Sequence, residues 1–192
     1  MAGRLRDKLM ELPEGSAVAL RMGADQYFDS IRDILDVFAP QKDLDVLYVT
    51  STIPSRSIIN ALEVLEIPMD HIWFVDCISQ IMMSGSVSEK HAHTIHVESP
   101  TMLENIMLKV EYLVRKTKER GNVIVLDSIN SLAIHNNTKI LSEFLHIMVS
   151  NLRSKNAYTI VFSMEQYETD EIRNMMNLVC DETIAVGADG VG

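Results

Sequence analysis

Short runs of apolar residues alternate along the chain with longer segments whose apolar residues recur every three or four positions. The short runs read as strands buried on both faces, and the longer segments read as helices with one apolar face. We expect strands at 17–21, 45–50, 72–76, 94–97, 122–127, 158–163 and 182–186, and helices at 28–38, 54–65, 99–121, 138–155 and 170–179. Alternating strands and helices predict an α/β fold, a three-layer sandwich around a mostly parallel central sheet.

Proline and glycine set the expected ends of these helices. Pro40 is expected to end the first helix, and Pro54 to open the second, because proline suits a first helical turn. Ser99 reads as an N-cap, followed by Pro100 in the first turn of a helix that stops at Gly121.

Length and composition favour one domain. The 192 residues are 47% apolar, and no repeat or Pro/Gly/Ser-rich linker divides them, so we expect a single domain over residues 1–192. No run reaches the roughly 18 uncharged apolar residues that a membrane span needs, and residues 1–14 lack the apolar core of a secretion signal. The two cysteines, Cys77 and Cys180, lie at the edges of apolar stretches, which fits a cytoplasmic, reducing environment.

Acidic side chains outnumber basic ones by 27 to 17, giving a formal charge of −10. This charge repels a phosphate backbone from any face without a local basic cluster, so nucleic acid is not an expected partner. The densest basic stretch, residues 109–120, is interpreted as a solvated helix face and C-terminus. Only a gathering of these side chains with Arg153 and Lys155 on one face would favour nucleic acid.

The segment after the first strand is the first candidate site, because ligands of parallel sheets bind at the carboxyl ends of the strands. A phosphate loop reads G-x-x-x-x-G-K-[S/T] there: glycines admit phosphates to backbone N–H groups, lysine neutralises them, and the hydroxyl ligates magnesium. The matching window keeps Gly23 and Ser30. Phe28 replaces the second glycine, with a ring in the space that phosphates need, and Asp29 replaces the lysine. A unit-charge pair about 4 Å apart is worth roughly 4 kcal/mol, so that reversal is a large loss.

Three blocks of the sequence resemble, in order, the RecA/KaiC-type P-loop ATPases, and together they cover nearly the whole chain. They are residues 17–38, where that family has its Walker A loop, residues 46–50, similar to the strand that ends in catalytic glutamates, and residues 123–128, which match a Walker B strand ending in Asp-Ser. Residues 99–184 also resemble degenerate KaiC-like proteins of archaea. The resemblance implies a RecA-like fold in a family whose subunits often bind nucleotide between neighbours and form rings.

The resemblance also shows what this sequence lacks. Thr52 and Ile53 stand where it would place the acidic pair that activates water, and neither is a base near neutral pH. It implies a vestigial nucleotide site at Gly23, Asp29, Ser30, Asp127 and Ser128, with no catalytic residue and no metal ligand. Asp127 can equally be a buried or capping carboxylate, because a magnesium role presupposes a nucleotide. Ser128 and Ser163 are then strand-end hydroxyls that bind local backbone groups.

We therefore expect a non-catalytic RecA/KaiC-like module without a cofactor. It would act through a protein partner or self-association, as a regulator or assembly component. The alternative is a nucleotide-binding switch that holds ATP and magnesium without cleaving the nucleotide. That switch would need a basic residue such as Arg21 or Arg32 in place of the missing lysine.

His91, His93 and His96, with Glu98 nearby, form the one cluster of metal-ligand residue types in the sequence. On an extended segment His96 points away from the other two, so we interpret the cluster as polar residues of a loop or edge. No sequence signature of a hydrolase ties a cysteine or serine to a histidine. The methionines at 82, 83, 102, 107, 148, 175 and 176 are interpreted as core residues, with an adaptable partner surface as the alternative.

Overall fold

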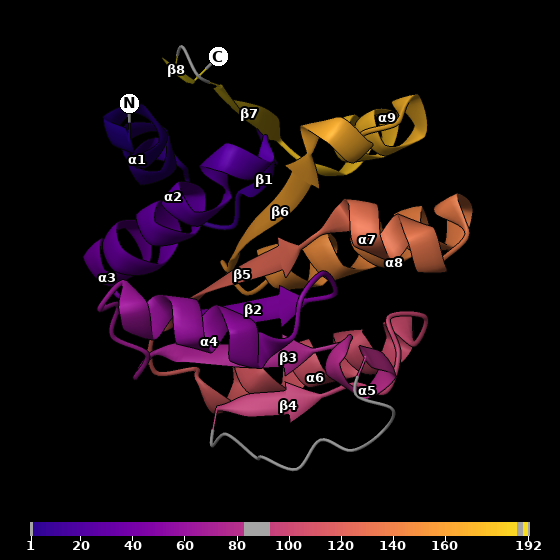
Figure 1. Ribbon diagram of the computed structural model, residues 1–192, viewed down its shortest axis with the longest axis horizontal. Helices are drawn as coiled ribbons and strands as arrows, with labels where there is room; N and C mark the ends of the chain where they lie inside the picture. The colour runs from indigo at the N-terminus through magenta and orange to yellow at the C-terminus, as the bar shows by residue number, and fades with distance from the viewer. Residues whose placement is uncertain (1, 83–92, 188–189, 192) are drawn as a thin grey trace.

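A computed structural model describes residues 2–82, 93–187 and 190–191 (Figure 1). Its strands are β1 (Ala17–Met22), β2 (Leu44–Thr50), β3 (Ile72–Asp76), β4 (Thr94–His96), β5 (Gly121–Asp127), β6 (Tyr158–Met164), β7 (Glu182–Gly187) and β8 (Gly190–Val191). They form one sheet in the order β4-β3-β2-β5-β6-β1-β7-β8. β1 to β7 pair in parallel, and β8 is antiparallel to β7. The predicted mostly parallel α/β sheet is confirmed.

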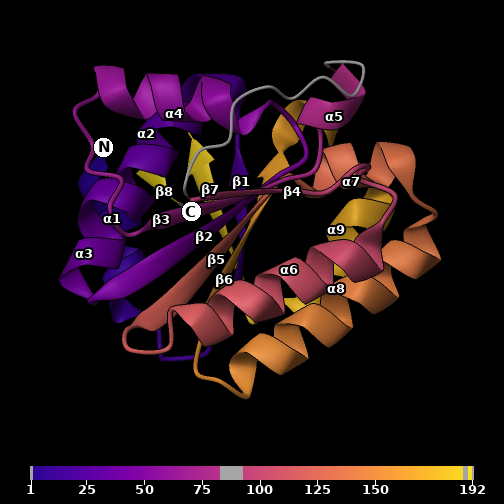
Figure 2. The same ribbon diagram turned by 90° about the horizontal axis from the view of Figure 1, so that it is seen from below.

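Helices cover both faces of this sheet (Figures 1 and 2). One face carries α1 (Ala2–Glu11), α2 (Tyr27–Arg32), the π-helical turn η2 (Asp33–Phe38), α3 (Ala39–Gln41) and α4 (Ser55–Val64). The other carries α6 (Leu103–Lys116), α7 (Ile129–His135), α8 (Thr138–Arg153) and α9 (Asp170–Val179). Three short elements, η1 (Ala24–Gln26), α5 (Ser79–Met82) and η3 (Glu165–Tyr167), follow strand ends. None of the helices in the described ranges is long and apolar enough to cross a membrane.

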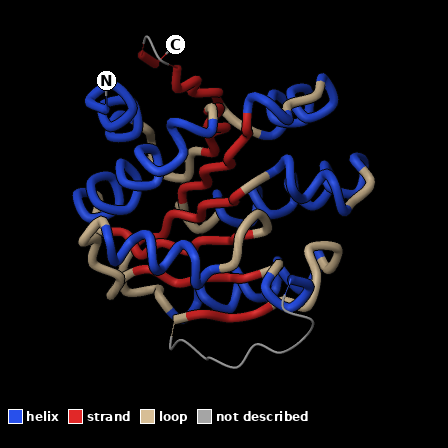
Figure 3. Tube along the Cα trace, in the orientation of Figure 1, coloured by secondary structure: helices blue, strands red, loops and turns tan. Residues whose placement is uncertain are grey.

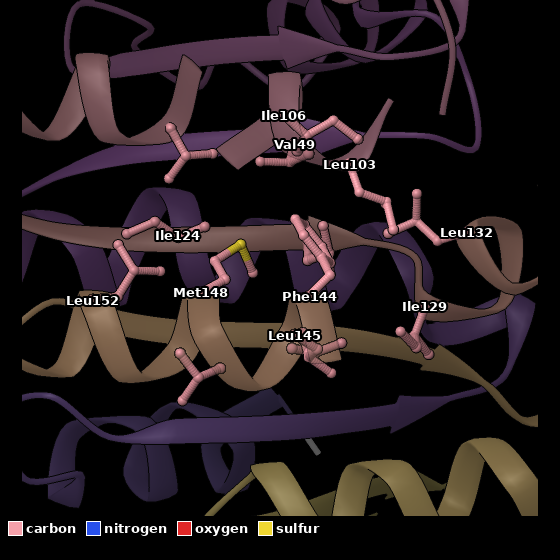
Figure 4. Close-up of a cluster of buried hydrophobic side chains, with 14 of the residues drawn as sticks. Val49, Leu103, Ile106, Ile124, Ile129, Leu132, Phe144, Leu145, Met148 and Leu152 are labelled. Atoms are coloured by element: carbon pink, nitrogen blue, oxygen red, sulfur yellow. The ribbon is translucent and has the colours of Figure 1, made fainter. Parts of the chain in front are cut away.

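The two helical layers enclose two apolar cores, one on each face of the sheet. In β5, Ile124 and Leu126 belong to the core under α6 to α9, while Val123 and Val125 belong to the core under α1 to α4. Figure 4 shows the first core, in which Met148 of α8 lies beside Ile124. A strand covered by helices on both sides must be apolar on both faces, which is why β5 reads as a continuous apolar run.

One continuous path of helix passes through Pro40, so the prediction that the helix ends before this proline is wrong. Pro40 lies in the first turn of α3, which continues directly from η2. Proline is tolerated there because an N–H in the first turn of a helix has no acceptor within that helix.

The predicted start and stop of the helix at 99–121 are also wrong. α6 begins at Leu103, and Ser99 lies in the preceding turn, where its hydroxyl accepts from the Thr101 N–H at 3.2 Å. The helix ends at Lys116, and Gly121 is instead the first residue of β5. Serine and proline favour turns as well as helix starts, and here Ser99 binds within a turn that ends before the helix begins.

Candidate functional site at the carboxyl edge of the sheet

The carboxyl ends of β1, β2, β5 and β6 lie at one edge of the sheet, where the arrowheads point in Figure 1. Asp127 is the last residue of β5, and its register partner Thr50 is the last residue of β2. Figure 3 shows that the segments leaving these strands turn into helices close to the edge. The edge therefore collects side chains from segments that lie far apart in the sequence.

The segment after β1 does not open into a wide phosphate loop. The Gly23 N–H donates to Gln26 Oε1 at 2.9 Å, and the turn η1 leads directly into α2. A Cβ atom at Gly23 would lie 2.7 Å from Asp25 Oδ1 and 2.8 Å from Gln26 Oε1. The side chains of the chain itself therefore occupy the space beside Gly23 that a phosphate would need.

Three hydroxyl groups engage the carboxylate of Asp127. The hydroxyls of Tyr27 and Tyr48 both donate to Oδ2, at 2.6 Å for Tyr48, and Thr52 Oγ1 donates to Oδ1 at 3.0 Å. Asp127 itself is completely buried. Both carboxylate oxygens thus have partners inside the chain, as a buried charge requires.

The electrostatics of this cluster follow from burial. Burial raises the pKa of Asp127, and the hydrogen bonds from Tyr27, Tyr48 and Thr52 oppose that rise. Burial and the nearby Asp127 charge raise the pKa of both tyrosines. The two phenols therefore stay protonated as donors near neutral pH, and neither can serve as a base there.

Ser128 begins α7 as its N-cap. Its Oγ accepts from the Ser131 N–H at 3.2 Å, and the peptide bond that joins it to Asp127 is cis. Ser51 connects β2 to this turn, because its hydroxyl lies 2.5 Å from Ser131 Oγ and donates to the Asp127 carbonyl at 3.2 Å. The serines bind one another and the backbone, as expected for strand-end hydroxyls.

Asp127 and Ser128 are consecutive in the sequence, and their hydrogen-bond partners do not include the other predicted residues, Gly23, Asp29 and Ser30. Asp29 is exposed on α2, and Ser30 is buried with no hydrogen-bond partner for its hydroxyl. Phe28 is 47% exposed and packs edge-on against Tyr27, with ring centroids 5.1 Å apart. The ring whose hydroxyl reaches Asp127 is therefore that of Tyr27. Phe28, whose ring the motif places in the phosphate space, instead lies half-exposed beside it.

Sequence reasoning missed Tyr27, Tyr48 and Ser131. Tyr27 lies inside the window inspected for a phosphate loop, and Tyr48 lies in the second block of resemblance. A tyrosine in a strand is normally read as an apolar body with a polar tip. Nothing in the spacing of these residues shows that their hydroxyls meet on one carboxylate.

The two arginines that could replace the missing lysine are both paired within the chain. Arg21 Nε lies 3.1 Å from Glu168 Oε2, and Glu168 also binds Arg173 at 2.9 Å. Arg32 Nε lies 3.7 Å from Asp36 Oδ2 on the same helix. Neither guanidinium is an uncompensated cation for a polyphosphate.

The residues at this edge do not fit magnesium with a triphosphate, the ligand that the fold family implies. The Asp127 oxygens are occupied by hydroxyl donors, the space beside Gly23 is filled, and Asp29 places a negative charge where an ammonium group is needed. Binding of this group would require the chain to rearrange and to give up several hydrogen bonds to a buried charge.

A pocket of about 660 Å³ lies beside the Asp127 cluster. Its walls come from the segment after β2, from α7, from η3 and from the start of α9. Most of the wall is apolar, with Ile53, Ile134, Met164 and Ile172 among the side chains that line it. A concave, mostly apolar space of this size is typical of a binding site.

The comparisons with known proteins bear on the fold. No family model matches the sequence, and no curated protein matches it. A KaiC-like protein of the hyperthermophilic archaeon Pyrococcus horikoshii OT3 has a similar solved structure, with a TM-score of 0.65 at 17% identity over 93% of this chain and 75% of that one. The flagellar accessory protein FlaH of Methanocaldococcus jannaschii gives 0.58 at 14% identity over the same shares. The chain thus has the α/β fold of KaiC-like, RecA-type proteins.

The other candidate constellations do not form sites in the described part of the chain. His93 stacks on Trp73 with centroids 4.0 Å apart, and Lys116 lies 4.6 Å above the same indole ring. His96 is in β4, and His91 lies outside the described residues. The described residues contain no group of three or more histidine, cysteine or acidic side chains that could hold a metal ion.

Two arginines considered for a basic face form ion pairs, and most of the described methionines lie in or against the core. Arg120 pairs with Asp43 at 3.0 Å and Arg153 with Asp181 at 2.9 Å, so these cations do not form a free basic face. Met148, Met175 and Met176 are buried, Met107 packs against the core, Met82 and Met102 are exposed, and Met83 lies outside the described residues.

Proposed function

We propose that this chain is a degenerate, KaiC-like pseudo-ATPase of the archaeal type, which acts by protein contact as a regulator or assembly partner and does not hydrolyse ATP. The single observation that carries the proposal is the engagement of Asp127 by Tyr27, Tyr48 and Thr52. In a working site a carboxylate at this position binds the metal ion, whereas here it accepts hydrogen bonds from three side chains of the chain itself.

Energetics support this proposal. Hydrogen bonds to a charged group contribute about 1.5–3 kcal/mol each, so a metal that displaced these donors would have to compensate several such bonds. The acids that would activate water are replaced by Thr52 and Ile53, and Thr52 is itself one of the donors to Asp127. The site thus lacks both an open ligand for magnesium and a base for hydrolysis.

The same geometry disfavours the nucleotide-binding switch. That switch needs a free cation near Ser30 and Asp127, and its two candidates, Arg21 and Arg32, are held by acidic side chains. We propose that the chain uses neither ATP nor magnesium as a cofactor. We also propose that it works in the reducing cytoplasm, which fits the free thiols of Cys77 and Cys180.

Action through contact has two supports. The chain keeps a fully packed RecA-type framework, including both cores, although its phosphate loop is closed. One of its structural neighbours is named as a flagellar accessory protein. Because one fold can host unrelated functions, a RecA-type framework can act through its surface rather than through catalysis.

The deciding experiment combines phosphate release with isothermal titration, both with ATP and magnesium. We expect no turnover and no saturable heat. A bound nucleotide at 100 times its dissociation constant would stabilise the fold by about 2.7 kcal/mol, so a thermal melt gives an independent reading. Turnover on the order of 1 per second would contradict the proposal.

A further inference from the structure

The pocket beside Asp127 has a rim of apolar side chains that no other part of the described chain covers. Ile134 at the end of α7 is 80% exposed, and Tyr167 in η3 is 67% exposed, yet both line the pocket. Ile172 lies deeper and is buried. Exposed apolar groups around a concave apolar space mark a surface that another molecule covers.

The polar groups of this pocket already bind one another. Asn130 accepts from the Met164 N–H at 2.7 Å, and Thr138 Oγ1 donates to Glu171 Oε2 at 3.0 Å. The Asp127 oxygens are likewise engaged. The pocket therefore offers apolar contact rather than a set of free hydrogen-bonding groups, and an occupant must gain most of its affinity from apolar burial.

The charge around the pocket is negative. Asp127 and Glu171 are its only charged lining residues within the described chain, and Asp25 is exposed next to the lining residue Ala24. Other charged groups lie next to the lining: Glu165 and Glu168 face Arg21, Glu168 and Asp170 hold Arg173, and Lys139 and His135 flank Thr138 and Ile134. These six acidic groups thus outnumber the two arginines, one lysine and one histidine around the pocket, and Asp25 and Glu171 form no ion pair within the described residues, which favours an occupant with positive charge.

We propose that this pocket docks an amphipathic helix of a partner protein, with an apolar side chain inside the pocket and lysine or arginine side chains over Glu171 and Asp25. The inference rests on the proposed function and names the surface that carries it. An apolar groove with exposed rim residues is the geometry that receives helices, whose anchors repeat at i, i+3, i+4 and i+7. A second copy of this chain is disfavoured by its charge of −10.

The probe is a designed amphipathic peptide of about 16 residues, with leucine on the apolar face and lysine on the other. A matched peptide carries glutamate at every lysine position. The full chain, labelled on isoleucine methyl groups, is titrated with each peptide and followed by NMR. We expect saturable shifts at the methyl groups of Ile53, Ile134 and Ile172 with the lysine peptide and none with the glutamate peptide.

Variants of the exposed rim test the site without disturbing the core. Ile134→Ser combined with Tyr167→Ser should weaken binding about ten-fold or more, as the loss of interface anchors does. Val64→Ser and Leu178→Ser replace residues that are 82% and 79% exposed and line no part of the pocket, so they should change nothing. Glu171→Lys should weaken the lysine peptide about two- to five-fold and improve the glutamate peptide.

Several outcomes would overturn the inference. They are equal binding of the two peptides, shifts at other methyl groups, no shift with either peptide at millimolar concentration, or unchanged affinity in the rim double variant. Shifts of the same methyl groups by indole, with neither peptide binding, would indicate a small apolar ligand. A dimer in sedimentation that the rim double variant dissociates would indicate a second copy of the chain.

The proposed function is tested separately on the same preparation, by its phosphate-release rate with ATP. Absence of turnover together with absence of peptide binding would reject only the docking surface. Turnover with peptide binding would reject only the loss of catalysis.

Discussion

Asp127 ends the central strand with both of its oxygens bound by hydroxyl groups of the chain. Tyr27 comes from α2, Tyr48 from β2 and Thr52 from the segment after β2, so one carboxylate holds three segments of the edge together. The bonds to a buried charge make the arrangement resistant to rearrangement. At this scale the site is a structural cluster whose residues reinforce one another.

Tyr48→Phe tests this cluster through stability. The substitution removes one donor to the buried Asp127 carboxylate, so we expect a loss of about 2 kcal/mol in the free energy of unfolding. Tyr112→Phe, at an exposed position of α6, is the matched control and should change stability by less than about 0.5 kcal/mol. Urea denaturation measures both, and equal effects would show that the Tyr48 hydroxyl contributes nothing.

Asp127→Asn tests the electrostatics of the same position through pH. Burial raises the pKa of Asp127 above its ordinary value of 3.8, so the folded state binds the proton more tightly than the unfolded state. The stability contributed by this proton is present below that value and is lost as pH rises through the raised pKa. The stability of the native chain relative to Asp127→Asn should therefore fall as pH rises from 3.8.

Denaturation of both chains at a series of pH values from about 3 to 8 measures this difference, a range that spans the ordinary and raised carboxyl pKa values. A difference that rises with pH over the same window would contradict the raised pKa.

The elements on the α1 side are joined by an ion pair. Arg6 of α1 binds Asp33 at the start of the π-helical turn η2, and the Asp33 side chain is almost completely buried. This pairing joins α1 to the helical segment that continues from α2, the helix of Tyr27. Burial raises the pKa of Asp33, and the bond from Arg6 opposes that effect.

Arg6→Met tests this link between elements. It would leave the buried Asp33 without its cation, and we expect a loss of about 2 kcal/mol in unfolding free energy, reduced from the value for a fully buried pair because Arg6 is partly exposed. Arg32→Met breaks an exposed pair between α2 and Asp36 of η2 and should cost less than about 1 kcal/mol. If the two variants melt alike, the Arg6 pair is not what holds α1 in place.

At the scale of the whole molecule, a RecA-type framework is complete while its phosphate loop is closed by its own side chains. The two cores, the parallel sheet and the flanking helices do not depend on a ligand for their packing, because each apolar strand face is covered by helices. The closed loop and the negative rim of the pocket lie at the same sheet edge. In the described residues, a mostly apolar pocket opens at this edge of the packed sheet.

Phe28→Gly combined with Asp29→Lys tests this interpretation, since the double variant restores the complete G-x-x-x-x-G-K-S motif. We expect no ATP hydrolysis, because Tyr27, Tyr48 and Thr52 still occupy Asp127 and no acid replaces Thr52 or Ile53. Phosphate release measures the outcome. Turnover at ordinary ATPase rates in this variant would show that the engagement of Asp127 does not prevent hydrolysis.

Prediction from sequence succeeded where the pattern reports burial. β3 and α9 have the predicted bounds, and β5 begins one residue early, because continuous apolar runs and helical periodicity follow directly from which faces are covered. α1 and α7 were missed. α7 has only seven residues and begins at a serine N-cap directly after a strand, where the sequence reads as part of a loop. α1 is as long as α9, but its apolar residues are few, with Leu5 and Leu9 buried in the core.

The sequence by itself determined the fold class, the negative charge and the broken phosphate motif, because these depend on residue type and order alone. Only the tertiary structure decided that Tyr27 and Tyr48 meet on Asp127 and that an apolar pocket opens beside them. Hydrogen bonds and cavities depend on side chains from distant segments, whose meeting requires the whole sheet to be assembled. For the same reason Phe28, which the motif placed in the site, lies half-exposed at its margin.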